Sequence, residues 1–257
     1  MMDTGLKDSV VLVTGGAGGI GQAICRAFAS EGANVVIHYN NSEENANLLA
    51  DEIGGIAVGA DLCMESDTAT MFELIVSKYG RIDICIANAG YYPPEPTPLW
   101  KMDMDRWKST VQNNLSVTIN TARQFLLNAK KSGTGSLVLI GSTAGIYGEA
   151  GHSDYAAAKG AITSGLLMSL KNEVATIGNI RVNAVAPGWT LTPKKVEQGI
   201  DDNTVNLATA TMALKKLATP EDVAKVCVSL SSDVISGHVT GQIIEVAGGM
   251  EGRLIYS

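Results

Sequence analysis

The sequence predicts an α/β fold in which a doubly wound parallel sheet of about seven strands carries helices on both faces. Short, β-branched apolar runs alternate with longer segments of helical period along the whole chain. The apolar runs are nearly continuous, which is typical of strands covered on both faces. No connection has the composition of an interdomain linker, so we expect residues 1–257 to form a single domain.

The elements follow from these two periods. Strands are expected at residues 10–14, 34–38, 55–60, 82–87, 136–141, 180–185 and 242–246. Helices are expected at residues 19–30, 42–53, 64–78, 104–131, 155–176 and 220–231. The Pro-rich stretch 91–100 and residues 189–217 interrupt the alternation after predicted strands, on the edge where open α/β sheets bind ligands. We expect them to wall a pocket, with 189–217 as its substrate loop or lid.

Composition excludes several classes of protein. Apolar residues make up 46% of the chain and charged residues 18%, enough for a full core and unlike a disordered chain. With a net charge of −7 and scattered basic residues, neither a nucleic acid nor a membrane is expected as a partner. The first residues lack the pattern of a secretory signal, which favours a cytoplasmic protein. The four cysteines have no metal-ligand spacing, so they are expected to be reduced and mostly buried, with no metal site.

A glycine-rich run joins the first predicted strand to the first predicted helix. It reads Thr14-Gly15-Gly16-Ala17-Gly18-Gly19-Ile20-Gly21. A pyrophosphate needs close approach to backbone N–H groups at a helix amino end, where the helix dipole also favours negative charge. Gly15 suits the tight turn, Gly19 the approach to phosphate, and Gly21 the packing of helix on strand. Placed between strand and helix, the run indicates a dinucleotide-binding turn of the Rossmann type.

Further motifs follow in a fixed order. They are Asp61-Leu62 after the third strand, Asn88-Ala89-Gly90 after the fourth, Asn114 in the long central helix, Ser142 after the fifth strand, Tyr155 with Lys159, and Pro187-Gly188, Thr190 and Thr192 after the sixth. Thirteen positions separate Ser142 from Tyr155, and the glycine run has the form TGxxxGxG. With this series, which spans almost the whole chain, the sequence resembles the short-chain dehydrogenase/reductase family.

The resemblance implies a set of cofactor contacts. Asp61 would hold the adenine ring, Asn88 would brace the central strands, and Thr192 would bind the nicotinamide carboxamide. Taken singly, Asp61 could be a solvated strand end and Asn88 a turn former. The full expected set is Gly15, Gly18, Gly19, Ile20, Gly21, Tyr39, Asn40, Asn41, Ser42, Asp61, Leu62, Asn88, Ala89, Gly90, Tyr155, Lys159, Pro187, Gly188, Thr190 and Thr192.

Four residues can carry acid–base chemistry. Hydride transfer to a carbonyl leaves an alkoxide that needs a proton, which the hydroxyl of Tyr155 can give. The pKa of a free tyrosine is about 10, and we expect Lys159, one helical turn away, to lower it. Ser142 can polarise the substrate oxygen, and by the resemblance Asn114 anchors a water that connects Lys159 to solvent. Without Ser142, a surface tyrosine and an exposed lysine would be the preferred interpretation.

The end of the second strand bears on cofactor choice. A carboxylate there would favour NAD(H), whereas the sequence has Tyr39-Asn40-Asn41-Ser42, whose neutral donors could hold a 2′-phosphate. NADP(H) is therefore the preferred prediction. NAD(H) stays open because no basic residue stands at Gly18 or Asn40, where family members that bind the phosphate often have one.

The substrate is expected to be a small carbonyl or alcohol compound whose identity and reaction direction stay open. Its predicted contacts are Ser142, Tyr91, Tyr147, His152, Tyr155 and Trp189, with Tyr92 and Trp100 as further pocket candidates. For His152 a solvated loop residue is the favoured alternative. The family implies a homotetramer through the helices at 104–131 and 155–176, with a dimer as the alternative. A noncatalytic dinucleotide-binding or scaffold protein, or a sugar-nucleotide epimerase, would be competing functions. The complete catalytic set and the glycine spacing argue against them.

Overall fold

The computed structural model describes residues 3–197 and 199–251. A single seven-stranded sheet of order β3-β2-β1-β4-β5-β6-β7, parallel throughout, forms its centre, which confirms the predicted fold class. Its strands are β1 (Val10–Val13), β2 (Asn34–Tyr39), β3 (Ile56–Gly59), β4 (Ile84–Ala87), β5 (Thr134–Ile140), β6 (Asn179–Pro187) and β7 (Ile243–Val246).

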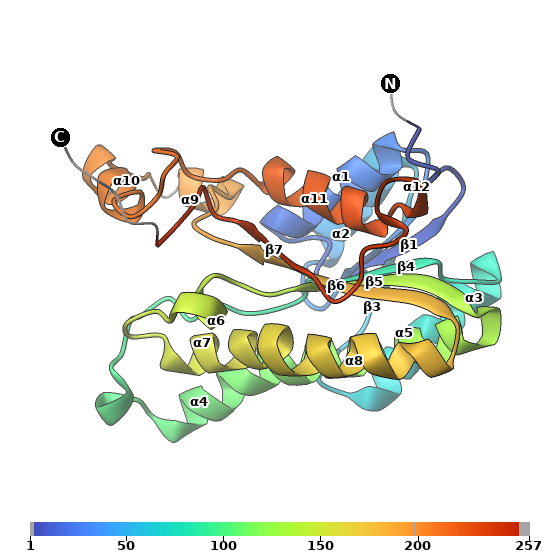
Figure 1. Ribbon diagram of the computed structural model, residues 1–257, viewed down its shortest axis with the longest axis horizontal. Coiled ribbons are helices and arrows are strands. Elements are labelled where there is room, and N and C mark those ends of the chain that lie inside the picture. Colours follow the sequence, from blue (N-terminus) through green and yellow to red (C-terminus); the bar gives the residue numbers. More distant parts are fainter. Residues whose placement is uncertain (1–2, 198, 252–257) are drawn as a thin grey trace.

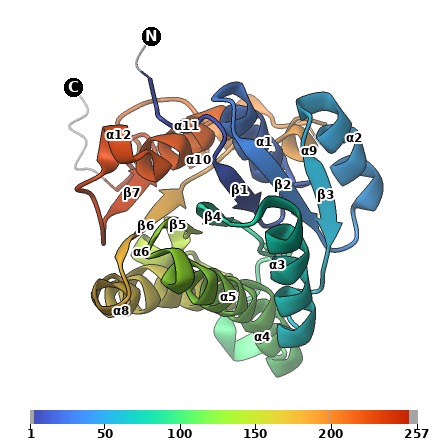
Figure 2. The ribbon, with the colours of Figure 1, turned by 90° about the vertical axis from the view of Figure 1, so that its right-hand side faces the viewer.

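Helices cover the sheet in two layers (Figures 1 and 2). One layer contains α1 (Gly19–Ser30), α2 (Glu43–Ile53), α11 (Pro220–Ser231) and the short α12 (Asp233–Ser236). The other contains α3 (Glu65–Tyr79), α4 (Met104–Val111), α5 (Val117–Ser132), α7 (Ser153–Gly160) and α8 (Leu167–Glu173). Shorter helices, α6 (Ala144–Tyr147), α9 (Pro193–Glu197) and α10 (Asp202–Ala208), gather toward one end of the molecule, as Figure 1 shows.

Alternate residues of each strand supply two separate cores. Val11 and Val13 of β1 belong to the apolar cluster that contains Phe28 of α1. Val10 and Leu12 of the same strand belong to the second cluster, beneath α3 and α5. Because successive side chains of a strand point to opposite faces, a continuous apolar run fills both layers. Packing on both faces is therefore the reason why continuous apolar runs in the sequence predict a doubly wound sheet.

The helices differ from prediction mainly in their interior. The predicted helix 104–131 is divided into α4 and α5 by a π-helical turn at Gln112–Ser116. A second π-helical segment, Ala161–Leu166, divides the predicted helix 155–176 into α7 and α8. Such turns add a residue without ending the helix, so the apolar periodicity hardly changes. The predicted loop or lid at 189–217 carries α9 and α10.

The strand order fixes where a ligand can enter. Between β1 and β4 the order of the strands reverses direction, and in open α/β sheets ligands bind at such a switch point, outside the carboxyl ends of the strands. The glycine run follows β1, and Asn88 follows β4, so the two motifs meet at this point. Among the described residues, no helix combines the length and apolarity needed to cross a bilayer.

Candidate active site

A hollow of 170 Å³ lies at the switch point. Six of the residues predicted to contact the cofactor line it: Gly15, Asn40, Asp61, Leu62, Ala89 and Gly90. Five others complete the wall: His38, Cys63, Tyr91, Asn113 and Val117. Of these, only Tyr91 is among the site residues that the sequence predicts, as a substrate contact. The hollow lies beside the glycine run, as a dinucleotide site requires.

The glycine run has the geometry that phosphate binding needs. Gly15 has φ of +62°, a conformation that favours glycine. A Cβ on Gly21 would lie 2.2 Å from the carbonyl oxygen of Gly15, so only glycine lets α1 begin this close to the turn. Gly18 is the N-cap and gives no side-chain hydrogen bond, which leaves the first N–H groups of α1 without a partner from the cap. These residues fit the pyrophosphate of a dinucleotide.

Asn88 ties the ends of β1 and β4 together. Its Nδ2 donates to the carbonyl oxygens of Thr14, at 2.9 Å, and Gly15, at 3.2 Å. In return the hydroxyl oxygen of Thr14 accepts the backbone N–H groups of Asn88, at 3.0 Å, and Ala89, at 3.1 Å. The turn after β1 and the segment after β4, which both contribute to the hollow, are thereby joined by side chains as well as by the sheet.

The segment after β6 reaches back over the glycine run. A Cβ on Gly19 would lie 3.0 Å from Cβ of Thr192 and 3.3 Å from Cδ of Pro193. Thr190 is buried, and its hydroxyl donates to the carbonyl oxygen of Gly188 at 3.0 Å. The start of the 189–217 segment therefore lies next to the predicted phosphate site.

Tyr155 and Lys159 lie one turn apart on α7, beside the end of β5. The Nζ of Lys159 is 5.8 Å from the ring centroid of Tyr155 and donates to the carbonyl oxygen of Ile140 at 2.9 Å. Ser142, just past β5, hydrogen-bonds to Tyr155 and also accepts the backbone N–H of Ala144 at 3.2 Å. The structure thus brings three of the four predicted catalytic side chains together.

Burial has the largest effect on the pKa values of Tyr155 and Lys159. It raises the pKa of Tyr155 to about 12, and the hydrogen bond from Ser142 offsets only part of that rise. It lowers the pKa of Lys159 to about 8. The expectation that Lys159 lowers the pKa of Tyr155 is therefore wrong for the protein alone. The reason is that desolvation disfavours the charged form of each group, and the ammonium is directed at Ile140.

Asn114 lies within the π-helical turn at Gln112–Ser116, a feature frequent at functional sites. Its Nδ2 donates to the carbonyl oxygens of Tyr91, at 2.7 Å, and Thr110, at 2.9 Å, and its Oδ1 accepts the N–H of Tyr91 at 3.2 Å. A Cβ on Gly90 would lie 2.8 Å from Oδ1 of Asn114 and 3.3 Å from Nζ of Lys159. Asn114 therefore fixes the strand-end segment that flanks Lys159.

Tyr92 links two of the predicted substrate contacts. Its ring stacks on His152 at 4.6 Å and meets the ring of Tyr155 edge-on at 5.1 Å. Its hydroxyl donates to Glu149 at 2.5 Å, and His152 Nε2 pairs with the carbonyl oxygen of Pro93 at 3.1 Å. His152 is only 4% exposed, so the alternative of a solvated loop residue is wrong. Glu149 was missed, because no spacing in the sequence connects it to Tyr92.

The remaining aromatic candidates occupy different environments. Tyr147 is half exposed, and its hydroxyl donates to Glu245 at 2.9 Å. Trp189 is 39% exposed, with the ammonium of Lys195 from α9 5.0 Å from its ring centroid. Trp100 is 84% exposed and thus projects into solvent in this structure, which removes the basis for treating it as a pocket residue.

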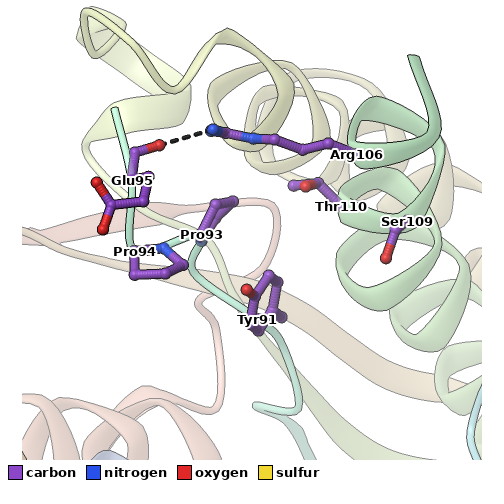
Figure 3. Close-up of a pocket in the computed structure, with 7 residues that line it drawn as sticks. All are labelled: Tyr91, Pro93, Pro94, Glu95, Arg106, Ser109 and Thr110. Atoms are coloured by element: carbon purple, nitrogen blue, oxygen red, sulfur yellow. Dashed lines mark hydrogen bonds between the residues drawn. The ribbon is translucent and has the colours of Figure 1, made fainter. Parts of the chain in front are cut away.

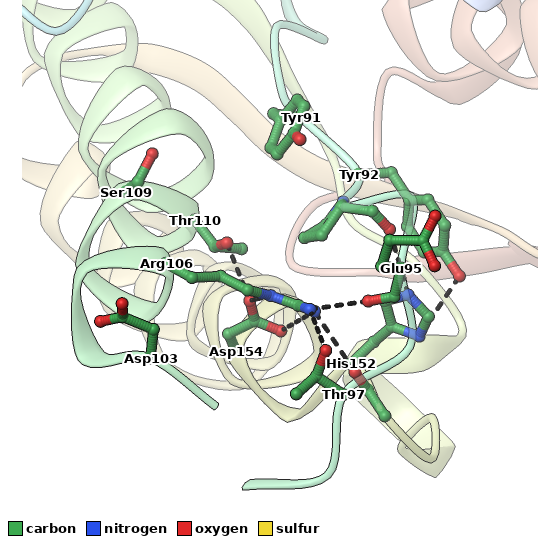
Figure 4. A network of polar contacts seen from close by, with 12 residues as sticks. Tyr91, Tyr92, Glu95, Thr97, Asp103, Arg106, Ser109, Thr110, His152 and Asp154 are labelled. Carbon is green, nitrogen blue, oxygen red and sulfur yellow. Dashed lines mark hydrogen bonds and ion pairs between the residues drawn. The ribbon is translucent and has the colours of Figure 1, made fainter. Parts of the chain in front are cut away.

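A buried ion pair supports the catalytic helix from below. Arg106 of α4 contacts Asp154, the neighbour of Tyr155, at 3.0 Å, and also donates to the carbonyl oxygen of Glu95 at 2.6 Å and the hydroxyl of Thr97 at 2.7 Å (Figure 4). Burial alone would raise the pKa of Asp154, but the hydrogen bonds from Arg106 and Thr110 hold it below its usual value. The network joins α4, the Pro-rich segment and α7.

A second hollow, of 280 Å³, lies beside this network (Figure 3). Its walls come from the Pro-rich segment and from α4: Tyr91, Pro93, Pro94, Glu95, Arg106, Ser109 and Thr110. None of the four predicted catalytic residues lines it. None of the four lines the switch-point hollow either, but Gly90 does, and a Cβ there would lie 3.3 Å from Nζ of Lys159. The catalytic side chains therefore adjoin the switch-point side of Tyr91, although the second hollow is the larger of the two.

Comparisons with known proteins agree with the motifs. A family model described as enoyl-(acyl carrier protein) reductase matches residues 15–251. The 3-oxoacyl-[acyl-carrier-protein] reductase of Thermotoga maritima is 35% identical over 250 residues, which cover 95% of this chain and 98% of the relative. The acetoacetyl-CoA reductase of Cupriavidus necator is 34% identical over 252 residues (95% and 99%).

A third relative has a different name. The cis-4-hydroxycyclohexanecarboxylate dehydrogenase of Sinomonas cyclohexanicum is 33% identical over 251 residues, which cover 96% of this chain and 98% of the relative. These relatives are reductases or dehydrogenases, and nothing among them supports the noncatalytic alternative. The chain belongs to the short-chain dehydrogenase/reductase family and is an NAD(P)-dependent oxidoreductase.

Proposed function

We propose that this enzyme interconverts a carbonyl and an alcohol at the hydroxyl of Tyr155. The observation that carries the proposal is the arrangement of buried Lys159 with partly buried Tyr155 and Ser142 at the carboxyl edge of the sheet, beside the switch-point hollow. A phenol, a hydroxyl and an ammonium group in one desolvated place are suited to proton transfer and to stabilising a developing oxyanion.

Each residue has a distinct proposed role. The nicotinamide cofactor supplies or accepts the hydride. Tyr155 gives a proton to the substrate oxygen in reduction, and Ser142 donates a hydrogen bond to that oxygen. Lys159 returns a proton to the phenol after each reduction, and Asn114 holds the segment at Gly90 and Tyr91 against it. With a pKa of about 12, Tyr155 is fully protonated at neutral pH, which is the form that reduction needs.

The dinucleotide is proposed to be NADP(H) in preference to NAD(H). Asn40 lines the hollow at the end of β2, and Asn40, Asn41 and Ser42 are exposed. Ser42 is the N-cap of α2, yet its side chain makes no cap hydrogen bond. These neutral donors suit a 2′-phosphate. Replacing Asn40 by Asp introduces a carboxylate where one would repel that phosphate, so the ratio of the two Kd values should shift toward NADH.

The substrate is proposed to be a small carbonyl compound, with a 3-oxoacyl thioester as the first class to test. The names of two of the three relatives reported above support this class, whereas the third names a hydroxycyclohexane carboxylate. The rings of Tyr92 and His152, stacked beside Tyr155, suit either type. Acetoacetyl-CoA and a cyclic 4-oxo carboxylate are therefore the two probes that separate the classes.

The experiment combines a panel of candidate substrates with one substitution in the enzyme. NADPH consumption is followed with both probes, simple ketones and sugars, for the wild type and for Tyr155→Phe. The variant should keep the cofactor Kd and lose turnover by at least about a hundredfold, as expected for loss of a general acid. Tyr79→Phe, at the end of α3, is the matched control and should behave as the wild type. Undiminished turnover in Tyr155→Phe would assign the acid to another group.

Two further proposals concern assembly and closure. Residues 189–217 are proposed to act as a lid, which the approach of Thr192 to Gly19 supports. Trypsin cleavage at Lys195, with and without NADPH, tests the lid, since closure should slow cleavage there.

A homotetramer is proposed because apolar side chains of α5 remain exposed, Ile119 by 40% and Leu127 by 47%. Light scattering of the purified protein distinguishes a tetramer from a dimer or a monomer.

A further inference from the structure

His38 occupies an unusual place at the end of β2. Its side chain is 2% exposed and forms part of the wall of the switch-point hollow. Its Nδ1 accepts the backbone N–H of Gly15 at 2.9 Å, and its Nε2 lies 3.0 Å from the carbonyl oxygen of Ala60. The imidazole therefore joins the first glycine of the phosphate-binding turn to the end of β3, immediately before Asp61.

These two partners determine the protonation state of the ring. The carbonyl oxygen of Ala60 can only accept, so Nε2 must carry a proton. The N–H of Gly15 can only donate, so Nδ1 must be without one. Both hydrogen bonds are satisfied by one neutral tautomer alone. A second proton on Nδ1 would point at the N–H of Gly15 and break that bond.

We infer that His38 is a positioning residue for the dinucleotide, which holds the phosphate-binding turn in its binding conformation only while the imidazole is neutral. The inference rests on the proposed dinucleotide site. Protonation would leave the N–H of Gly15 unpaired and place a positive charge in a buried wall, so the turn must shift. Cofactor affinity should then fall in acid through His38 itself.

The surrounding charges allow this titration. Neither the glycine run 14–21 nor β3 contains an ionisable side chain. Asp61 and Cys63 line the same hollow, and the negative charge of Asp61 favours the protonated ring. Beneath the run, burial raises the pKa of Cys25 to about 12, so this thiol stays neutral. Burial nevertheless dominates at His38 and lowers its pKa from the ordinary value.

Two substitutions separate the hydrogen bonds. In His38→Asn the amide Oδ1 takes the place of Nδ1 and accepts from Gly15 without titrating. In His38→Gln the amide Nε2 can replace the donor to Ala60, but no acceptor remains beside Gly15. The Kd of NADPH and of NADH is measured for the wild type and both variants by fluorescence titration between pH 5 and pH 8, with circular dichroism to confirm folding at each pH.

At pH 8, His38→Asn keeps the acceptor beside Gly15, so its Kd should lie closer to the wild-type value than that of His38→Gln, which should bind about fivefold more weakly than the wild type, as expected for one lost hydrogen bond. Toward pH 5 the wild-type Kd should rise relative to that of His38→Asn, approaching tenfold per pH unit below the pKa of the ring. The 2′-phosphate of NADPH titrates near pH 6 as well, but it does so in both proteins and cancels in their ratio.

The outcomes are distinguishable. A ratio of wild-type to His38→Asn Kd that stays constant from pH 8 to pH 5, with both proteins folded, overturns the inference about His38 and leaves the dinucleotide site in place. Equal affinity of His38→Gln and the wild type at pH 8 overturns the role of the Gly15 bond. If the folded wild type binds neither NADPH nor NADH at any pH, the proposed dinucleotide site itself fails.

Discussion

Removing the carboxylate of Asp154 should destabilise the protein strongly, because this group is fully buried and paired. In Asp154→Ala, Arg106 loses its ionic partner, and the hydroxyl of Thr110 loses its acceptor at 2.8 Å. Breaking a buried ion pair by removing one member costs about 3–5 kcal/mol. Arg106 is 21% exposed and keeps acceptors at Glu95 and Thr97, so we expect the lower end of that range, about 3 kcal/mol.

The assay is thermal unfolding followed by circular dichroism. For a chain of this size, about 3 kcal/mol corresponds to a fall in Tm of roughly 6–12 °C. The effect should depend on pH with a definite sign. Since the pKa of Asp154 is lowered in the folded protein, its contribution is present above the unfolded pKa of about 3.9 and is lost as the pH falls through the folded pKa. The difference between wild type and variant should therefore shrink in acid.

Asp105→Ala is the matched control. Asp105 pairs with Lys108 on the same helix as Arg106, but its side chain is 85% exposed. Exposed pairs of this kind contribute at most about 1 kcal/mol, so its Tm should stay within a few degrees of the wild type. Equal shifts in the two variants, or an undiminished difference at pH 3, would refute the reasoning from burial.

Two other predictions concern the site directly. Alcohol oxidation needs the phenolate of Tyr155, and with a pKa of about 12 its fraction rises about tenfold per pH unit, so initial oxidation rates should climb from pH 7 to pH 10; a flat profile would point to another base or another slow step. Gly21→Ala places a Cβ 2.2 Å from the carbonyl oxygen of Gly15, so the Kd of NADPH in fluorescence titration should rise at least about tenfold. Gly165→Ala meets nothing within 4 Å and should bind like the wild type, which makes it the control.

The sheet was predictable because local signals and packing agree. Each strand is a β-branched apolar run that supplies both cores, so its position follows from composition alone. The motifs of the site follow strand ends, and the carboxyl ends of parallel strands necessarily meet at one edge. This is why the sequence alone leads one to expect Gly15, Asp61 and Gly90 in a shared hollow.

The burial of individual side chains could not be predicted from the sequence in the same way. His152 lies in a polar, glycine-containing stretch, yet the ring of Tyr92 covers it. Arg106 and Asp154 are 48 positions apart, and only the packing of α4 on α7 brings them together. The number of atoms around a side chain depends on such long-range contacts, whereas helical phase depends on spacing alone. The same distinction explains why the pKa of Tyr155 lies above the expected value.

The pKa of Tyr155 is raised and that of Lys159 is lowered, and this difference predicts a role for Lys159 that can be tested separately. With pKa values of about 8 for the ammonium and about 12 for the phenol, the ammonium is the stronger acid. In the proposed reduction, a phenolate left by proton donation would therefore regain its proton at the expense of Lys159. Lys159→Met should then slow steady-state turnover far more than the first turnover of preloaded enzyme, once NADPH is saturating. If the first turnover slows as much as the steady state, the ammonium acts during the proton donation itself, by stabilising charge at the phenol, and the resupply argument is wrong.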